Sequence, residues 1–348
     1  NETVEGDDSG LVFLSTARTN KAQVIGYDYV GGIVGANALL EGAELERDDI
    51  PDAAELERCS VRKVYSEKML VKNWINEGII HAAGSYAGGI AGYNAGVLQS
   101  CTTKINTSSG GGSSLLAQAV LYGSEASYVG GITGCNLGWI HNENTVDGDA
   151  VIQVNSVVAG KKYVGGIAGY NGTTVDESGA LTDKSGMIRN YALAGGYISG
   201  ECFAGGYVGL NTTEKLLGEE ALLLSKPNEV TADYFAGGVM GALILVPGSD
   251  VRVNCGTDNF FGKVEANNAF AGGYVAYTQL LASGGSDAAD ARAEALYQVL
   301  AEEEISGNID INSGRRQEAL QTLAEKVLDD GRNTNNDSAF RLNFIYGG

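Results

Sequence analysis

The sequence predicts an all-β repeat protein, a β-helix or β-solenoid of about seven turns with short helical insertions and a helical C-terminal region. Three observations predict it. A glycine-rich motif, aromatic-x-Gly-Gly-x-x-Gly-x-Asn, recurs seven times with some decay. Short apolar runs and turns flank the copies, and the 348 residues include 51 glycines but only 3 prolines. Glycine gathered in runs rich in Val, Ile and Tyr is typical of packed β structure and not of disorder.

The seven copies keep one pattern at uneven spacing. The distance between successive first glycines ranges from 57 residues (Gly31 to Gly88) to 32 residues (Gly205 to Gly237). Self-similarity of this kind indicates supersecondary units that stack on one another. The last two copies lose the closing Asn, and the seventh also replaces its third glycine by Ala276. The copies are Tyr29 to Asn37, Tyr86 to Asn94, Tyr128 to Asn136, Tyr163 to Asn171, Phe203 to Asn211, Phe235 to Leu243 and Phe270 to Thr278.

We interpret the motif as one strand. Positions one and five would then share one face, and positions two and six the other. Both faces are apolar, so we expect burial on both sides. Glycine weakens a strand, so a neighbouring backbone or aromatic ring should approach too closely for any Cβ. Stacked copies would align aromatic on aromatic, and the closing Asn would lie at a left-handed turn or form an Asn ladder.

Apolar runs on either side of the motif predict further strands. They give about three short strands per copy, as one turn of a β-helix requires. An antiparallel sandwich of hairpins is the competing architecture, but the recurrence of one strand in register favours parallel stacking. The clearest runs are Gln23 to Gly26, Ala119 to Gly123 and Ser156 to Gly160 before the motif, and Gly96 to Leu98, Gly138 to Ile140 and Gly186 to Ile188 after it.

The chain divides into a repeat region at residues 1–280 and a C-terminal region at 281–348. The acidic insertion at 38–58 is helix-prone, with Pro51 at the start of a second short helix. In the C-terminal region, apolar spacing predicts two helices with closing strands between and after them. We expect this region to cover a sheet edge and cap or continue the solenoid, or to contact a further domain or partner. The predicted elements are helices at 287–304 and 315–330 and strands around 305–311 and 340–346.

The copy Tyr163-Val-Gly-Gly-Ile-Ala-Gly-Tyr-Asn171 resembles the GLUG repeat of large bacterial surface proteins, some of them immunoglobulin A peptidases. Tyr86 to Asn94 fits that pattern nearly as well, and the resemblance covers about residues 20–280 as spaced islands. It implies an extracellular or cell-wall location and a stalk or adhesive role. It carries over no catalytic residue, and the sequence lacks the His-Glu-x-x-His pattern of a zinc peptidase.

The net charge of −20 argues against nucleic acid and anionic membrane surfaces as partners. No apolar run is long enough to cross a membrane, so direct membrane insertion is not expected. We interpret the chain as a piece of a longer protein, with any signal peptide or anchor outside it. Buried thiols are expected for the five scattered cysteines, with one or two disulfides between turns as the alternative. They are Cys59, Cys101, Cys135, Cys202 and Cys255.

Candidate chemistry is sparse. His81 and His141 are the only histidines, and neither accompanies a nucleophile motif. Glu143, Asp147 and Asp149 offer hard oxygen ligands for Ca²⁺, although their spacing fits neither the EF-hand nor the nonapeptide calcium repeat. A solvated loop is the expected role of these three acids, and calcium is the one cofactor they suggest.

These observations favour a non-enzymatic extracellular structural or adhesive module, a stalk or adhesin, of a larger bacterial surface protein. Its expected partner is a host or neighbouring-cell surface protein or glycan, or other copies of itself. Two alternatives stay open. A polysaccharide-active β-helix enzyme would bring paired carboxylates together on one face. A self-assembling filament or surface-layer subunit would expose open sheet ends.

Overall fold

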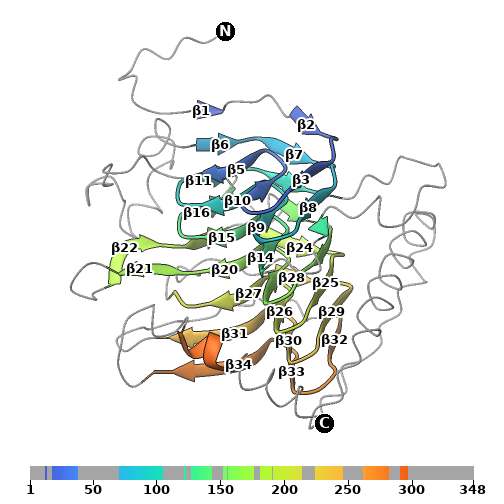
Figure 1. The fold of residues 1–348 in the computed structure, drawn as a ribbon, viewed down its shortest axis with the longest axis vertical. Coiled ribbons are helices and arrows are strands. Elements are labelled where there is room, and N and C mark those ends of the chain that lie inside the picture. Colours follow the sequence, from blue (N-terminus) through green and yellow to red (C-terminus); the bar gives the residue numbers. More distant parts are fainter. Residues whose placement is uncertain are drawn as a thin grey trace, which may run out of the picture.

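The structure is a computed structural model that describes most of the repeat region and part of one C-terminal helix. The described residues form an all-β stack of parallel sheets, as the repeat predicts, together with one short helix (Figure 1). The stack runs along the long axis of the molecule from β1 to β34. The described residues are 12–13, 18–37, 70–104, 121–122, 127–142, 152–154, 156–175, 181–189, 191–213, 224–245, 262–281 and 291–296.

Two seven-stranded parallel sheets form the spine of the stack, and every motif copy gives one strand to each. The first sheet contains β4 (Val30–Gly31), β9 (Ser85–Gly88), β14 (Ser127–Gly130), β19 (Tyr163–Gly165), β26 (Phe203–Gly205), β30 (Phe235–Gly237) and β33 (Phe270–Gly272). The second contains β5 (Val34–Asn37), β10 (Ala91–Asn94), β15 (Thr133–Asn136), β20 (Ala168–Asn171), β27 (Val208–Asn211), β31 (Met240–Leu245) and β34 (Val275–Leu280).

The apolar runs outside the motif form the remaining parallel sheets. A five-stranded sheet contains β1 (Val12–Phe13), β6 (Leu70–Lys72), β11 (Val97–Gln99), β16 (Trp139–His141) and β23 (Met187–Arg189). Two three-stranded sheets contain β2 (Arg18–Asn20), β7 (Trp74–Asn76) and β12 (Thr102–Thr103), and β3 (Val24–Gly26), β8 (Ile80–Ala82) and β13 (Leu121–Tyr122). A third contains β17 (Ile152–Val154), β24 (Tyr191–Ala194) and β28 (Leu224–Lys226). A four-stranded sheet contains β18 (Val157–Ala159), β25 (Tyr197–Gly200), β29 (Glu229–Ala232) and β32 (Lys263–Ala266).

The order of these strands makes the stack solenoid-like. The second copy follows β6, β7, β8, β9 and β10 through five different sheets, and the next strand, β11, pairs again with β6. This copy therefore has five strands where the sequence predicts about three. Among the described strands only β21 (Thr173–Val175) and β22 (Leu181–Ser185) pair antiparallel, so the hairpin sandwich is wrong.

The motif is not one strand, contrary to the expectation. The chain bends between its second glycine and position five, so β9 ends at Gly88 and β10 begins at Ala91. The bend breaks the two-residue alternation, and positions two, five and six all face the inner core. In the second copy these are Ala87, Ile90 and Ala91, all nearly inaccessible to solvent. Positions one and eight, here Tyr86 and Tyr93, pack in a separate outer cluster.

The glycines make this bend possible, and their neighbours are backbone atoms rather than aromatic rings. A Cβ on Gly88 would overlap the carbonyl oxygen of Ala91, three residues later in the same turn. A Cβ on Gly166 would overlap the carbonyl oxygen of Gly206, the equivalent glycine of the next copy, and would lie 2.6 Å from Leu193 Cδ2. The first glycine thus closes the corner, and the second lets neighbouring corners stack.

The closing asparagines form a buried ladder, which confirms one of the two roles proposed for them. Each side-chain amide donates from Nδ2 to Oδ1 of the Asn in the next copy, at distances of 2.9, 2.8, 2.8 and 2.9 Å. At the last rung, Asn211 donates to the backbone carbonyl of Thr213 at 2.8 Å, because the next copy holds Leu243 there. The rungs are Asn37, Asn94, Asn136, Asn171 and Asn211.

One C-terminal helix is partly described, at residues 291–296, inside the predicted helix at 287–304. Ala293 is fully buried in the outer cluster, and Leu296 packs against the same cluster. Lys162 Nζ donates to both carboxylate oxygens of Glu294, at 2.9 and 2.8 Å. The described part of the helix thus lies on the flank of the stack. The predicted insertion at 38–58, the helix at 315–330 and the strands at 305–311 and 340–346 lie outside the described residues.

We predict that Gly166→Val lowers the free energy of unfolding by about 3 kcal/mol or more, because the added atoms overlap backbone that cannot move aside. Urea denaturation followed by circular dichroism measures the effect. Gly200→Ala is the control, since its Cβ would meet mainly the methyl groups of Val164 and Ala204, at 3.0 and 3.4 Å. Its expected cost is below about 1 kcal/mol. Equal costs at the two glycines would contradict this account of the stacked corners.

Candidate functional site

Among the described residues, the two histidines are separated and the three cysteines are buried. His81 is half-buried on β8, and His141 is buried on β16 in a different sheet. Cys101, Cys135 and Cys202 are buried thiols. Burial raises the pKa of the Cys101 thiol to about 12 and that of Cys202 well above its usual range. A thiol held in that state is a poor nucleophile.

The calcium candidates Glu143, Asp147 and Asp149 lie outside the described residues, as do Cys59 and Cys255. Within the described part of the chain, no three His, Cys, Asp or Glu side chains gather closely enough to hold a metal ion. No described helix has the length and apolar character to cross a membrane.

A ladder of aromatic rings, one from position one of each copy, runs through the outer cluster along the stack. Ring centroids of neighbouring copies lie 4.6 to 5.7 Å apart, and five of the six pairs are stacked within 18° of parallel. The sixth pair, Tyr128 and Tyr163, is tilted by 43° at 4.8 Å. The ladder contains Tyr29, Tyr86, Tyr128, Tyr163, Phe203, Phe235 and Phe270.

Rings from position eight brace this ladder edge-on. Tyr93 meets Tyr86 at 6.1 Å and 89°, and Tyr170 meets Tyr128 at 5.9 Å and 86°. Tyr277 does the same for Phe235 at 5.6 Å. Edge-to-face and stacked pairs are the favourable arrangements for aromatic rings, each worth roughly 0.5–1.5 kcal/mol beyond area burial. The outer cluster is therefore a second core, built on the flank of the stack.

Exposure of the ladder changes along the stack. Tyr163, Phe203 and Phe235 are buried, and the helix at 291–296 packs on this part of the outer cluster. Tyr86 and Tyr128 are half-buried. Inner rings have both faces covered by their neighbours, so the half-buried Tyr86 and Tyr128 can offer solvent only their edges and hydroxyls. The flank is therefore unsuited to stacking against the flat face of a sugar, except at the terminal rings.

The position of Tyr86 in this cluster changes its acidity. The pKa of Tyr86 is raised to about 12, mainly because the phenol is buried. Smaller contributions come from the neighbouring groups Cys135, Tyr29, Tyr93 and Asp28, which disfavour a negative charge on the phenol. Burial also raises the pKa of Tyr93. The phenols of Tyr86 and Tyr93 therefore stay neutral hydrogen-bonding groups at physiological pH.

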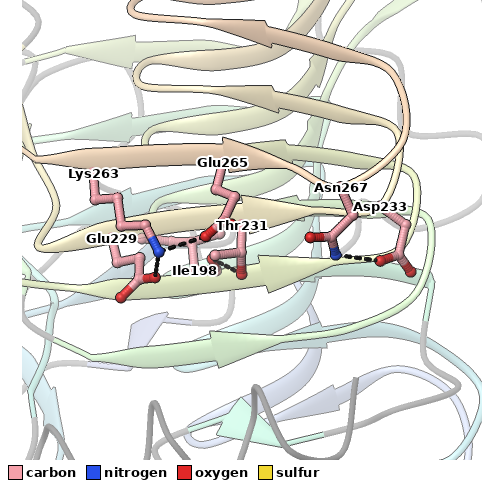
Figure 2. Close-up of polar contacts among 7 residues, drawn as sticks. All are labelled: Ile198, Glu229, Thr231, Asp233, Lys263, Glu265 and Asn267. Carbon is pink, nitrogen blue, oxygen red and sulfur yellow. Dashed lines mark hydrogen bonds and ion pairs between the residues drawn. The ribbon is translucent and has the colours of Figure 1, made fainter. Parts of the chain in front are cut away.

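A charged cluster lies at the C-terminal end of the four-stranded sheet (Figure 2). Lys263 on β32 donates to Glu229 on β29 at 3.0 Å and also pairs with Glu265. Burial alone would lower the pKa of Lys263, but the hydrogen bonds to Glu265 and Glu229 outweigh it and raise that pKa. Nearby, Asn267 donates to Asp233 at 2.9 Å. A lysine thus sits between the two glutamates, and its single positive charge offsets one of their two negative charges.

Sequence reasoning missed both position eight and this cluster. Alignment of the copies would have revealed both features. Position eight holds Tyr in copies two, four and seven, which marks it as a second aromatic position. Glu229 pairs in register with Tyr197 and Lys263, and Tyr197 pairs with Val157. The row across this sheet therefore contains two apolar residues, then the carboxylate of Glu229 and the ammonium of Lys263. Opposite charges at equivalent positions of consecutive copies were the signal in the sequence that could have predicted this ion pair.

No family model matches the chain, and no curated protein and no solved structure shows significant similarity to it.

We predict that Tyr86 makes stability fall at alkaline pH. Its phenol holds the proton more tightly in the folded chain than in the unfolded one, so its contribution is complete below pH 10 and is lost as the pH rises toward 12. Urea midpoints measured across that window should fall less steeply for Tyr86→Phe than for the natural chain. An identical pH dependence in the two proteins would exclude this role.

We also predict that Lys263→Met destabilises by about 1–2 kcal/mol, because Glu229, only 6 % exposed, loses its ammonium partner. Glu265→Gln is the control, since that carboxylate is 48 % exposed and should change stability by less than about 0.5 kcal/mol. Chemical unfolding of both variants gives the comparison. A larger loss at Glu265 would reverse the assignment of the buried partner.

Proposed function

We propose that this chain is a non-enzymatic structural and adhesive module, a stalk or adhesin, of a larger extracellular bacterial surface protein. One observation carries the proposal: every recurrent position of the motif has a structural use. The aromatic ring stacks on its neighbour, the glycines close and stack the corner, and the Asn extends a buried ladder. A repeat whose recurrent positions all serve stacking and turning is suited to a scaffold that extends along one axis.

We propose further that the stack is a closed β-helix of seven turns. The return of β11 to β6, and of β10 to β5, supports winding of each copy onto the one before. At roughly 4.8 Å between stacked strands, seven turns extend about 30 Å. A rod of this kind holds a binding surface away from an anchoring point.

The proposed membership of the GLUG-repeat proteins rests on the motif itself. The strand-bend-strand corner uses the same positions that make Tyr163 to Asn171 resemble that repeat. Placement at the cell surface or cell wall follows from the resemblance. The proposed partner is a surface protein or glycan of a host or neighbouring cell, and the net charge of −20 disfavours nucleic acid.

Three observations on the described residues weigh against an enzyme of the polysaccharide-cleaving kind. The two histidines lie in different sheets, and Cys101 and Cys202 have raised thiol pKa values. Glu229 and Glu265 share the ammonium of Lys263, whereas a glycosidase needs one carboxyl that donates a proton and one that is free to attack or to activate water.

Binding of the purified chain to glycan arrays and to intact cells tests the proposal. We expect saturable binding without any cleavage product, and loss of binding for Gly166→Val, which disrupts the stacked corners. Chromatography of polysaccharide and peptide substrates after incubation checks for cleavage. Cleavage that disappears in a Glu229→Gln, Glu265→Gln double variant would replace the adhesive role with an enzymatic one.

A further inference from the structure

The C-terminal end of the stack exposes side chains that interior copies bury. Tyr274, at position five of the last copy, is 45 % exposed, whereas Tyr207 and Val239 at the same position are buried. Phe270 is 51 % exposed, whereas Phe203 and Phe235 are fully buried. In the interior these positions are covered by the following copy. The C-terminal end is therefore a cross-section of both the inner core and the aromatic ladder.

The N-terminal end shows the same cross-section from the other side. Tyr29 is 48 % exposed, and Ile25 and Tyr27 beside it are 66 % and 70 % exposed. Ile33, at position five of the first copy, is half-buried, whereas Ile90 and Ile132 are fully buried at that position. Large apolar side chains exposed together at a surface indicate an interaction site.

The two ends of the ladder each have one covered ring face. Tyr29 stacks on Tyr86 at 4.8 Å and 18°, and Phe270 stacks on Phe235 at 5.2 Å and 9°. Among the described residues no further ring stacks on the opposite face of either. The sheets end in the same way: β4 and β5 are the last described strands at one end of the two seven-stranded sheets, and β33 and β34 at the other.

We propose that a second copy of this chain docks head-to-tail, with the C-terminal end of one molecule on the N-terminal end of the next. The register inside the chain supplies the geometry, since Phe235 pairs with Phe270 and Val30 with Ala87 at equivalent motif positions. In the docked pair Phe270 stacks on Tyr29, β33 extends the sheet that begins with β4, and β34 extends the sheet that begins with β5. The contact between two molecules therefore uses the same ring stacking and parallel strand pairing that join neighbouring copies within one molecule.

A second copy fits these ends better than a peptide does. An extended peptide would satisfy the edge of one sheet only. Another stack offers two sheet edges, a ring and the inner core residues at once, at the spacing that the exposed end requires. The interface is heterologous, because different surfaces of the two molecules meet, so it does not close at two and allows growth of an open filament.

This inference rests on the geometry of the ends and not on the adhesive role proposed above. A monomer that binds a glycan would refute head-to-tail docking and leave the adhesive role standing. A filament that binds no cell-surface ligand would do the reverse. Because each whole chain carries a net charge of −20, added salt should strengthen the association of two chains by screening their repulsion.

Sedimentation velocity and light scattering of the full chain, over about two decades of concentration, test the proposal. We expect species that grow with concentration and do not stop at the dimer. Tyr29→Lys disables the N-terminal end and Phe270→Lys the C-terminal end, so each variant alone should associate at least about tenfold more weakly. Ala83→Lys adds the same charge on the exposed flank of the second copy and should assemble like the natural chain.

A mixture of the two end variants gives the sharpest outcome. Tyr29→Lys keeps an intact C-terminal end and Phe270→Lys an intact N-terminal end, so the mixture should form dimers that grow no further. Circular dichroism and urea midpoints confirm that each variant is folded, and Ile25→Lys and Tyr274→Lys replace any that is not. A monomeric natural chain at all concentrations, a closed dimer, or self-association of either end variant at the natural strength would overturn the proposal.

Discussion

The close approach of successive backbones at the Gly-Gly corner is the constraint on which the rest of this structure depends. Gly166 lies against the carbonyl of Gly206, and Gly131 lies in the same way against Gly166. Because no Cβ fits there, the corners of neighbouring copies stack directly on one another. That contact fixes the register of both seven-stranded sheets, since the strands on either side of the corner inherit its position.

Register in turn creates the two ladders. Once equivalent residues lie one above another, the closing asparagines come within hydrogen-bonding distance and the position-one rings come within stacking distance. The bend at the corner separates their surroundings. Ile90 faces the inner core while Tyr86 faces outward, although both belong to one nine-residue motif. The protein thus has an aliphatic core inside the stack and an aromatic core on its flank.

The same regularity explains why function is sought at the ends and on the irregular parts. Interior rings of the ladder are covered on both faces, and the asparagines are buried. Only where the repeat stops are a ring face, a sheet edge and core side chains left exposed together, at Tyr29 and at Phe270. A structural role for the module and head-to-tail docking at its ends are thus consequences of one repeated contact.

The sequence by itself determined the repeat, the parallel stacking and most flanking strands, because period and register are properties of the chain. It indicated the Asn ladder as one of two roles for the closing asparagines, and the structure decided between them. The recurrent glycines of the motif also indicated that a neighbouring group approaches those positions too closely for a Cβ. Only the tertiary structure decided that the motif bends into two strands, because alternation along a chain cannot reveal a corner that glycine permits. The outer cluster and the pairing of Lys263 with Glu229 likewise depend on which copies lie side by side. Lys263 and Glu229 belong to different copies, 34 positions apart, so the pattern within one copy does not encode their contact, although an alignment of the copies places them side by side.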